Sequence, residues 1–550
     1  MKKNLTVWNL FSVVILAAFA LFIMYPIFLI LYRSVIHGDT GALTLQNFAH
    51  FFAKKFYWGT MVNSLKVTVV STILSAALGL PLAYLMRSVK IKGSSFLNIL
   101  IVISYLSPPF IGAYAWIQML GRQGVITQFL NDTFGLHYGG VYGFVGIVLV
   151  FTLQSFPLVY IYVSGALKNL DNSLNEAAES LGCSRMGRIW KIIVPLVMPT
   201  LLASSMLVFM RVFADFGTPM LIGEGYKTLP VLIYNQFMGE VSGDDGFAAA
   251  ICCIVIGLTI VMFFVQRFLA GRNTYAMTAL KPMAAESLGG LRNILAHLAV
   301  YMVVGLAILP QFVVVYTSFL ATNGGQVFTG GFALQSYDAT LFAKDNDVIW
   351  HTYFLGLCAI AAVLVLGVLI AYLSVRKRNT LNSILDVITM FPFIIPGSVL
   401  GIAFVFAFNK SPIILTGTAL IMIISFAVRR MPYTVRSSTA ILGNISPSIE
   451  EAAISLGASD MTTFRKITVP MMMPGVLSGA IMSWVTIISE LSSSIILYTN
   501  STQTLTVSIY TEVIRGNYGN ASAYATILTV TSILSLLLFY KVTGRRDVSV

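Results

Sequence analysis

Long apolar runs, most of them free of charged side chains, recur along the whole chain. About 20 apolar residues suffice for a helix to cross a bilayer, and twelve such runs can be recognised, in two sets of six. A polar stretch at 267–292 separates the sets. The expected spans are 4–32, 67–86, 96–120, 138–167, 195–222, 247–266, 294–320, 349–375, 387–408, 412–428, 470–497 and 522–540. The pattern predicts an all-α, polytopic membrane protein.

The composition agrees with this fold class and excludes several others. Of the 550 residues 57% are hydrophobic and only 10% are charged, with a mean hydropathy of +0.85, far from the values of soluble domains. Four cysteines cannot hold together a disulfide scaffold of this size. Nucleic-acid binding is also excluded, because no stretch combines clustered Lys and Arg with aromatic residues.

The distribution of positive charge predicts the orientation. An even number of spans places both termini on one side of the membrane, and the cytoplasmic side of a membrane protein carries the excess of Lys and Arg. Most of the 34 lysines and arginines fall on the side of the N-terminus, if Arg429 and Arg430 are counted there. Both termini are therefore expected in the cytoplasm. The apolar run after Lys2 and Lys3 is too long for a signal peptide and is expected to be a retained helix.

A sequence repeat divides the chain at half its length. The segment Glu176-Ala177-Ala178-Glu179-Ser180-Leu181-Gly182 recurs as Glu451-Ala452-Ala453-Ile454-Ser455-Leu456-Gly457. Further pairs at the same spacing are Lys191 and Lys466, Pro195 and Pro470, Pro199 and Pro474, Pro157 and Pro432, and Asp215 and Glu490. Because both copies lie in loops that precede a span, the chain is expected to be a tandem duplication of a six-helix unit.

The repeat predicts two domains and their symmetry. The first unit is expected at 1–275, with its core at about 60–270, and the second at 294–550, with its core at about 349–542. A cytoplasmic linker at 276–293 joins them. Since six is even, both units enter the membrane in the same direction, and a pseudo-twofold axis along the membrane normal should relate them.

Each repeated loop contains the signals of a short helix. Ser173 and Ser448 stand three residues before a glutamate, the spacing of a capping box. Gly182 and Gly457 are expected at the left-handed position that ends the helix. A second amphipathic helix should follow, with a proline opening the next span. An ordinary surface connector would explain one such loop, but two copies favour a docking element.

The repeated frame resembles the EAA motif of binding-protein-dependent ABC importer permeases. The resemblance covers the whole chain as two fused MetI-like domains, and its one departure is a valine before each proline where leucine is commoner. It implies that the short helices couple to an ATPase subunit on the cytoplasmic side of a bacterial inner membrane. The coupling residues that it implies are Glu176, Ala177, Ala178, Gly182, Pro195, Glu451, Ala452, Ala453, Gly457 and Pro470.

The expected partners follow from what the chain lacks. It contains no Gly-Lys dipeptide and hence no P-loop, so ATP hydrolysis is expected from a separate subunit, which the symmetry favours as a homodimer. The resemblance also implies an external solute-binding protein. The chain itself is expected to be a pore subunit rather than an enzyme, without a cofactor of its own.

Three charged residues inside spans are the candidates for a transport pathway. They are Arg211, Asp215 and Glu490, and charges in such positions usually face the interior of a helix bundle. Arg211 and Asp215 are spaced to form a structural pair on one helix face. A pathway role is the alternative, since Asp215 and Glu490 are repeat equivalents, and two acids near an axis would suit a cation or a water-filled gate.

The cargo is expected from resemblance alone. The five histidines and four cysteines show no metal-ligand spacing, so the permease itself is not expected to hold a metal. A single-chain fusion of this kind is similar to the ferric-iron importer permeases, and similar fusions serve 2-aminoethylphosphonate and thiamine. Polyamine permeases share the Phe-Gly-Thr-Pro element at 216–219. A secondary transporter or channel is the alternative class, but it gives no reason for the duplicated loop.

Overall fold

The computed structural model describes residues 7–36, 41–135, 139–239, 245–271, 285–325, 327–342 and 347–543. Half of the expected linker, at 276–284, and the basic residues Lys2, Lys3, Arg545 and Arg546 lie outside the described residues. The described part is almost entirely helical, with one two-stranded antiparallel sheet. The all-α prediction is thus confirmed.

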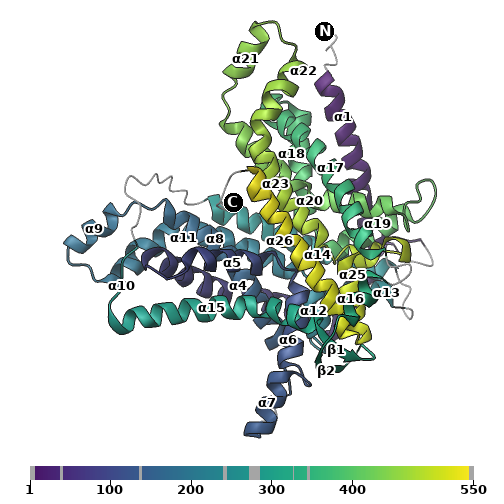
Figure 1. Cartoon of the computed structure of the whole chain (residues 1–550). Coiled ribbons are helices and arrows are strands. Elements are labelled where there is room, and N and C mark those ends of the chain that lie inside the picture. Colours follow the sequence, from purple (N-terminus) through teal and green to yellow (C-terminus); the bar gives the residue numbers. More distant parts are fainter. Residues whose placement is uncertain are drawn as a thin grey trace. The chain divides into compact units, whose positions relative to one another are not determined.

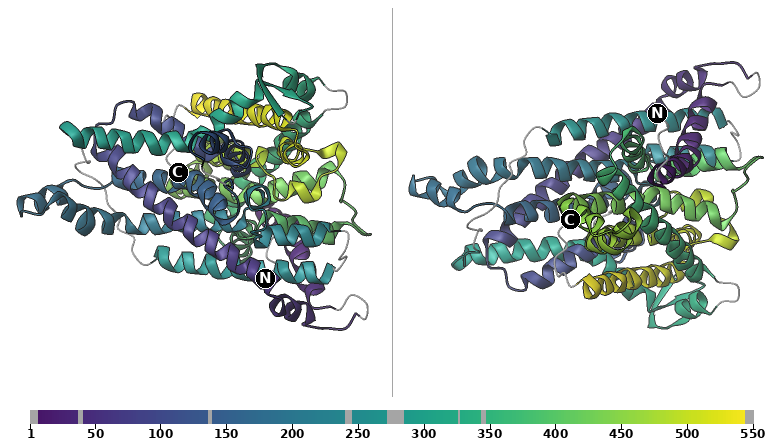
Figure 2. Two further views of the ribbon diagram at one scale, coloured as in Figure 1. Left: turned by 90° about the horizontal axis from the view of Figure 1, so that it is seen from below. Right: turned by 90° about the horizontal axis from the view of Figure 1, so that it is seen from above.

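The chain forms two compact units, each of which contains a bundle of long helices that lie side by side (Figures 1 and 2). Unit 2 comprises 55–232 and 257–334, together with a C-terminal stretch outside the described residues. Its helices and strands are α4 (Lys55–Ser88), α5 (Ser94–Leu106), α6 (Pro109–Leu120), α7 (Val125–Phe134), α8 (Gly143–Lys168), α9 (Ser173–Ser180), α10 (Arg185–Arg188), α11 (Val194–Ala214), α12 (Gly217–Ile222), α15 (Gly290–Ser318), β1 (Leu320–Asn323) and β2 (Val327–Phe332).

Unit 1 comprises 1–54, 233–256 and 335–546. Its helices are α1 (Val7–Phe19), α2 (Tyr25–Ser34), α3 (Gln46–Ala53), α16 (Gln335–Leu341), α17 (Val348–Arg376), α18 (Thr380–Ile394), α19 (Gly397–Phe408), α20 (Ala419–Asn444), α21 (Ser448–Ser455), α22 (Asp460–Thr463), α23 (Val469–Ile488), α24 (Ser494–Leu497), α25 (Leu505–Arg515) and α26 (Tyr518–Thr543). Two helices, α13 (Leu229–Met238) and α14 (Asp245–Gly271), contribute residues to both units.

The membrane spans agree with the prediction in kind and differ in detail. Among the described residues, nine helices are long and apolar enough to cross a membrane. Two further apolar pairs are bent: α5 and the helices that follow it by 100°, and α18 and α19 by 111°. The apolar segments expected to span at 96–120 and 387–408 are therefore helical but sharply broken. A proline stands at each break, Pro108 and Pro396, and a proline disfavours helical geometry in the residue before it.

The predicted span at 412–428 is also misplaced. Helix α20 begins at Ala419 and continues to Asn444, so Arg429 and Arg430 lie in the middle of a helix rather than in a cytoplasmic loop. By the repeat spacing α20 is the counterpart of α8, whose position and length it shares. The sequence pattern ended the span early because the two arginines interrupt its apolar run.

Each compact unit contains the leading helix of the opposite sequence half. In unit 1, Trp8 of α1 packs on Tyr372 of α17, with ring centroids 4.7 Å apart, and Ser12 Oγ donates to Asn382 Oδ1 of α18 at 2.7 Å. In unit 2, α15 packs on α5 and α6, and Thr317 Oγ1 donates to Gln118 Oε1 at 3.2 Å. The predicted domain boundaries at 275 and 293 separate the two copies of the sequence repeat. The compact units have other boundaries, because each of them includes the leading helix of the other copy.

The internal repeat is visible in matching contacts. In unit 2 the Ser64 hydroxyl accepts a hydrogen bond from the backbone N–H of Leu229 at 2.7 Å. In unit 1 the Thr352 hydroxyl accepts from Leu505 N at the same distance. Each bond ties the start of a long helix to the start of a short helix, α4 to α13 and α17 to α25. Two copies of one design therefore underlie the two units.

Candidate functional site

The repeated loops form short helices that stand out from their units. Helices α9 and α21 occupy equivalent positions, just before the two long helices that end at Ala214 and Ile488 (Figure 1). Glu176, Ala177, Glu451 and Ala452 are all exposed. These four of the predicted coupling residues are thus at the surface, where a partner can reach them, whereas Ala453 is buried.

The ends of both short helices match the prediction. Gly182 and Gly457 have φ of +80° and +91°, which glycine adopts at little cost. In the first copy Cys183 N donates to Ala178 O at 2.9 Å, and in the second Ala458 N donates to Ala453 O at 3.1 Å. This six-to-one bond satisfies a carbonyl that a helix end leaves free and defines a Schellman motif. Both predicted C′ glycines are confirmed.

The beginnings of the short helices differ from the prediction. The expected capping boxes are not what starts them, because the N-cap residues are Asn172 and Pro447, one position earlier. Instead, Asn172 Nδ2 donates to Glu176 Oε1 at 2.9 Å, and Ser173 N donates to Asp171 Oδ1 at 2.9 Å. Glu176 N, from which the Ser173 hydroxyl was expected to accept, donates to Asn172 O at 2.9 Å, and Asp171 takes the place of Glu176 as the acceptor for Ser173 N.

One exposed apolar side chain in each loop was not singled out by the sequence patterns. Leu181 and Leu456 directly precede the two glycines and are 88% and 90% exposed. The left-handed turn points the chain away from the helix at this position, so each leucine projects into solvent. Each leucine is an apolar side chain that is available for burial against a partner.

The helix after each loop is continuous with the membrane span. A wide π turn at Ile189–Ile193 precedes Pro195, and another at Phe464–Thr468 precedes Pro470. Proline in a helix clashes with the carbonyl four residues earlier, and the wider turn accommodates it. Each proline stands in the first turn of α11 or α23, as predicted, but the second helix of the loop and the span form one continuous helix of about 30 residues, which begins after the glycine.

Glu490 lies in a buried cluster of three charged side chains in unit 1. Its carboxylate is 3% exposed and accepts hydrogen bonds from the guanidinium groups of Arg429 and Arg430 on α20. The backbone N–H of Ser493 also donates to Glu490 Oε1, at 3.2 Å. Gly397 packs so closely on Arg429 that a Cβ there would lie 2.2 Å from its Nη1. The cluster carries one net positive charge and is tightly packed.

Arg211 and Asp215 lie in the equivalent region of unit 2. Asp215 Oδ1 accepts a hydrogen bond from Thr218 N at 2.9 Å, which matches the bond between Glu490 and Ser493 by repeat spacing. The Arg211 guanidinium stacks over the Tyr105 ring at 4.8 Å from its centroid. Asp215 also borders a cavity of about 10 Å³, which suffices for one water molecule. The suggested pairing of Arg211 with Asp215 stays a prediction.

The described residues contain no group of three or more His, Cys, Asp and Glu side chains arranged to hold a metal ion. All four cysteines are free thiols, and Cys252 is buried. The chemical groups that the two loops and the two acids offer are therefore carboxylates, guanidinium groups and exposed apolar side chains.

Comparison with known proteins identifies both halves. The family model described as "binding-protein-dependent transport system inner membrane component" matches twice, at residues 75–275 and 363–546. The two matches confirm the internal duplication. Each match begins within the bundle helix α4 or α17 and therefore leaves out the leading helix of its half.

Relatives of the chain are transport permeases. It is 30% identical over 546 residues to the ferric transport system permease protein FbpB of Actinobacillus pleuropneumoniae, covering 97% of this chain and 78% of the relative. The Fe(3+)-transport system permease protein FbpB 2 of Haemophilus influenzae is 25% identical over 483 residues, 87% of this chain and 89% of the relative. The molybdenum transport system permease protein ModB of Escherichia coli is 28% identical over 218 residues, 39% of this chain and 93% of the relative.

Proposed function

Because the chain belongs to the family of inner membrane components of binding-protein-dependent transport systems, we propose that it is the pore subunit of an ATP-driven importer of ferric iron. The observation that carries the proposal is the pair of exposed helix–glycine loops, α9 and α21, each followed after its glycine by a helix that continues into a membrane span. A secondary transporter has no use for two such loops.

The partner on the cytoplasmic side is an ATPase, supplied as a homodimer. Each loop presents an exposed glutamate, an exposed alanine and an exposed leucine, so the two surfaces offer the same chemistry to two equivalent grooves. A displacement of either groove pushes on a continuous helical rod, and ATP binding and hydrolysis in the partner thereby move the membrane helices. This chain binds no nucleotide or other cofactor of its own in the proposed cycle.

The proposed orientation places both loops, and both termini, in the cytoplasm. The two repeated loops and the helices directly after them carry Arg185, Arg188, Lys191, Arg465 and Lys466, in agreement with the positive-inside rule. Because Arg429 and Arg430 lie within a helix, they no longer count among the cytoplasmic loop residues, but the cytoplasmic loops still hold more Lys and Arg than the loops on the opposite side. An external solute-binding protein then delivers the cargo from the opposite side.

The proposal of ferric iron rests on similarity over nearly the full length of two ferric permeases. The in-membrane charges do not add to it, because Glu490 is neutralised by two arginines and offers a cation no free carboxylate. The cargo is therefore selected by the external binding protein, and the permease passes on what that protein releases.

The cargo is tested by purifying the solute-binding protein encoded beside this chain and identifying its ligand. Tightly held Fe(III), and iron uptake that depends on this chain, are the expected results. Bound 2-aminoethylphosphonate, thiamine or a polyamine would replace ferric iron while leaving the importer class intact. Transport that continues without any ATPase subunit would refute the class itself.

The coupling loops are tested by two double variants of the complex. Replacing Glu176 and Gly182 by alanine, or Glu451 and Gly457 by alanine, should leave ATP hydrolysis but reduce uptake. ATPase activity and uptake are measured in the same proteoliposomes. Unchanged coupling in both double variants would remove the role proposed for the loops.

A further inference from the structure

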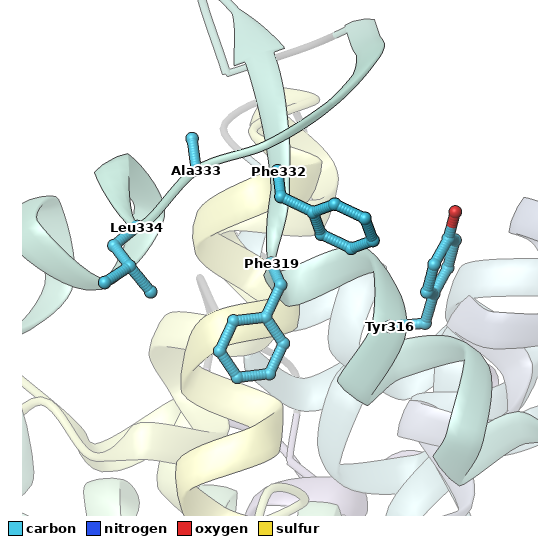
Figure 3. A pocket seen from close by; sticks show the side chains of 5 residues that line it. All are labelled: Tyr316, Phe319, Phe332, Ala333 and Leu334. Carbon is cyan, nitrogen blue, oxygen red and sulfur yellow. The ribbon is translucent and has the colours of Figure 1, made fainter.

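The end of α15 and the β1–β2 hairpin form an apolar groove on the surface of unit 2. It has a volume of about 340 Å³ and is lined by Tyr316, Phe319, Phe332, Ala333 and Leu334. The rings of Tyr316 and Phe332 lie edge to face, with their centroids 6.1 Å apart (Figure 3). Phe332 is 76% exposed and Leu334 60%, so the groove is open.

The groove continues an exposed apolar stripe that follows one face of α15. Most of the exposed residues recur every three or four positions, the spacing of one helix face. They are Leu291, Ile294, Leu295, Leu298, Tyr301, Met302 and Leu306 and, after a gap in which Leu309 is partly exposed, Phe312, Tyr316 and Phe319. In a membrane protein an apolar face of this length contacts lipid, and the second part of the stripe leads into the groove.

The groove lies at one boundary of the bilayer. The first turns of α15 lie beside the C-terminal end of α4, where the backbone N–H of Lys92 donates to His297 Nε2. Helix α8 runs parallel to α4 and leads at its C-terminal end into α9. The far end of α15, with the hairpin, is thus opposite the coupling loop. Tyr and Phe rings gather at such boundaries, where an apolar body meets a hydrated surface.

The hairpin itself is divided into an apolar base and a polar tip. Phe332 and Leu334 stand at the base, next to α15, while Asn323 and Gly324 stand near the turn and are exposed. The chain carries no Lys, Arg, Asp or Glu between Arg292 and Asp338. This stretch therefore offers a soluble partner no charged side chain with which to form an ion pair.

We propose that this groove binds the acyl chain of a bilayer phospholipid and thereby anchors the β1–β2 hairpin in the membrane interface on the side of the external binding protein. The groove offers the acyl chain an apolar lining of aromatic and aliphatic side chains. The Tyr316 hydroxyl stands at its edge, toward the hydrated headgroups (Figure 3). The anchor fixes the height of α15 in the bilayer, and it does not depend on the cargo of the transporter.

Tryptophan fluorescence tests the proposal on the full chain in lipid nanodiscs. Phe332→Trp places a reporter in the groove, Phe319→Trp is a second reporter there, and Asn323→Trp is the matched control near the tip. The emission added by each variant is obtained by subtracting that of the unmodified chain. In phosphatidylcholine brominated along its acyl chains, the groove reporters should lose most of their added emission, and the control should keep it.

Aqueous iodide supplies the opposite comparison. It should quench the Asn323→Trp control strongly and the groove reporters weakly. Groove reporters that iodide quenches as strongly as the control, and that brominated lipid leaves bright, would overturn the proposal. Groove reporters shielded only after the external binding protein is added would also overturn it, in favour of a protein-docking surface. If Phe332→Trp does not fold, Phe319→Trp decides between the same outcomes.

Discussion

The two coupling loops share their ends but not their attachments. In unit 1, Arg376 at the end of α17 donates from Nε to Glu450 Oε1 of α21 at 2.9 Å and from Nη2 to Ile445 O at 2.7 Å. Both side chains of the ion pair are about 10% exposed. The second coupling helix is thus fastened to a bundle helix by a largely buried charge pair.

The first coupling helix lacks this attachment. At the repeat position of Glu450 stands Asn175, whose buried Oδ1 has no hydrogen-bond partner among the described residues. The ion pair of this loop joins Arg188 and Glu179 at 2.5 Å, with the Glu179 side chain 64% exposed. All residues of α9 are at least partly exposed. The first loop is therefore held by its own backbone turn more than by contacts with its bundle.

The same asymmetry recurs in the membrane. Unit 1 holds the cluster of Glu490 with Arg429 and Arg430, whereas the repeat positions of the arginines in unit 2 are Gln154 and Ser155. Gln154 is 4% exposed, and neither atom of its amide has a hydrogen-bond partner among the described residues. Duplication thus preserved the backbone design, while charge pairing became concentrated in one copy. The second copy is expected to be the stiffer of the two.

The largest effect is expected from the buried charge cluster. Glu490→Gln leaves two arginines without their counter-charge, and removing one partner of a buried ion pair costs about 3–5 kcal/mol. The melting temperature in detergent should fall markedly. Asp215→Asn should cost about 1 kcal/mol or less, because the asparagine oxygen still accepts from Thr218 N. Equal losses for the two variants would show that the units do not differ as described.

The attachment of the second loop comes next. Arg376→Ala leaves Glu450 unpaired in a largely buried place and should cost about 3 kcal/mol. Arg188→Ala breaks an exposed pair and should cost below about 1 kcal/mol. Thermal unfolding measures both, and limited proteolysis shows whether α21 detaches first. If Arg188→Ala is the more damaging variant, the first loop is the firmly attached one.

A smaller and equal effect is expected from the two loop glycines. Gly182→Ala and Gly457→Ala force a side chain into a left-handed conformation, which costs about 1–2 kcal/mol. A Cβ at either position meets nothing within 4 Å, so backbone strain is the only cost. Asparagine, which tolerates this conformation, should cost less than alanine at both sites. A large difference between Gly182→Ala and Gly457→Ala in thermal unfolding would reveal contacts beyond the shared turn.

The smallest effect on stability is expected from the exposed leucines. Leu181→Ser and Leu456→Ser remove side chains that face solvent, and such surface changes stay within about 0.5 kcal/mol. Their effect should appear in binding, as a loss of about 1 kcal/mol or more of affinity for the ATPase subunit. Co-purification and titration measure it. Unchanged affinity in both variants would show that neither leucine enters the partner.

The sequence predicted what depends on local patterns. Apolar runs located most spans, and the spacing of Glu176 and Gly182 located a short helix with its left-handed end. The predicted capping by Ser173 failed because the helix begins one residue earlier, so that Glu176 N donates to Asn172 O and Ser173 N donates to Asp171 in place of Glu176. Two acceptors in reach of one donor cannot be ranked from spacing alone.

Contacts between distant segments could not be predicted in this way. Arg429 and Arg430 ended an apolar run, so they looked like loop residues, and only their pairing with Glu490 explains why they lie within a helix. The partners of Trp8 and of Thr317 lie in the other sequence half. Hydrophobic periodicity indicates which face of a helix is buried, but it does not indicate which other segment of the chain packs against that face.

The exchanged leading helices have a consequence for biosynthesis. Unit 2 has all of its described residues once Leu334 has left the ribosome. Unit 1 must wait, because Trp8 is made long before Tyr372 and Phe464, against which its ring packs. Of the described helices, the earliest to be made is therefore the one that waits longest for its neighbours. During that interval lipids or insertion factors must cover the face that Trp8 and Ser12 later bury.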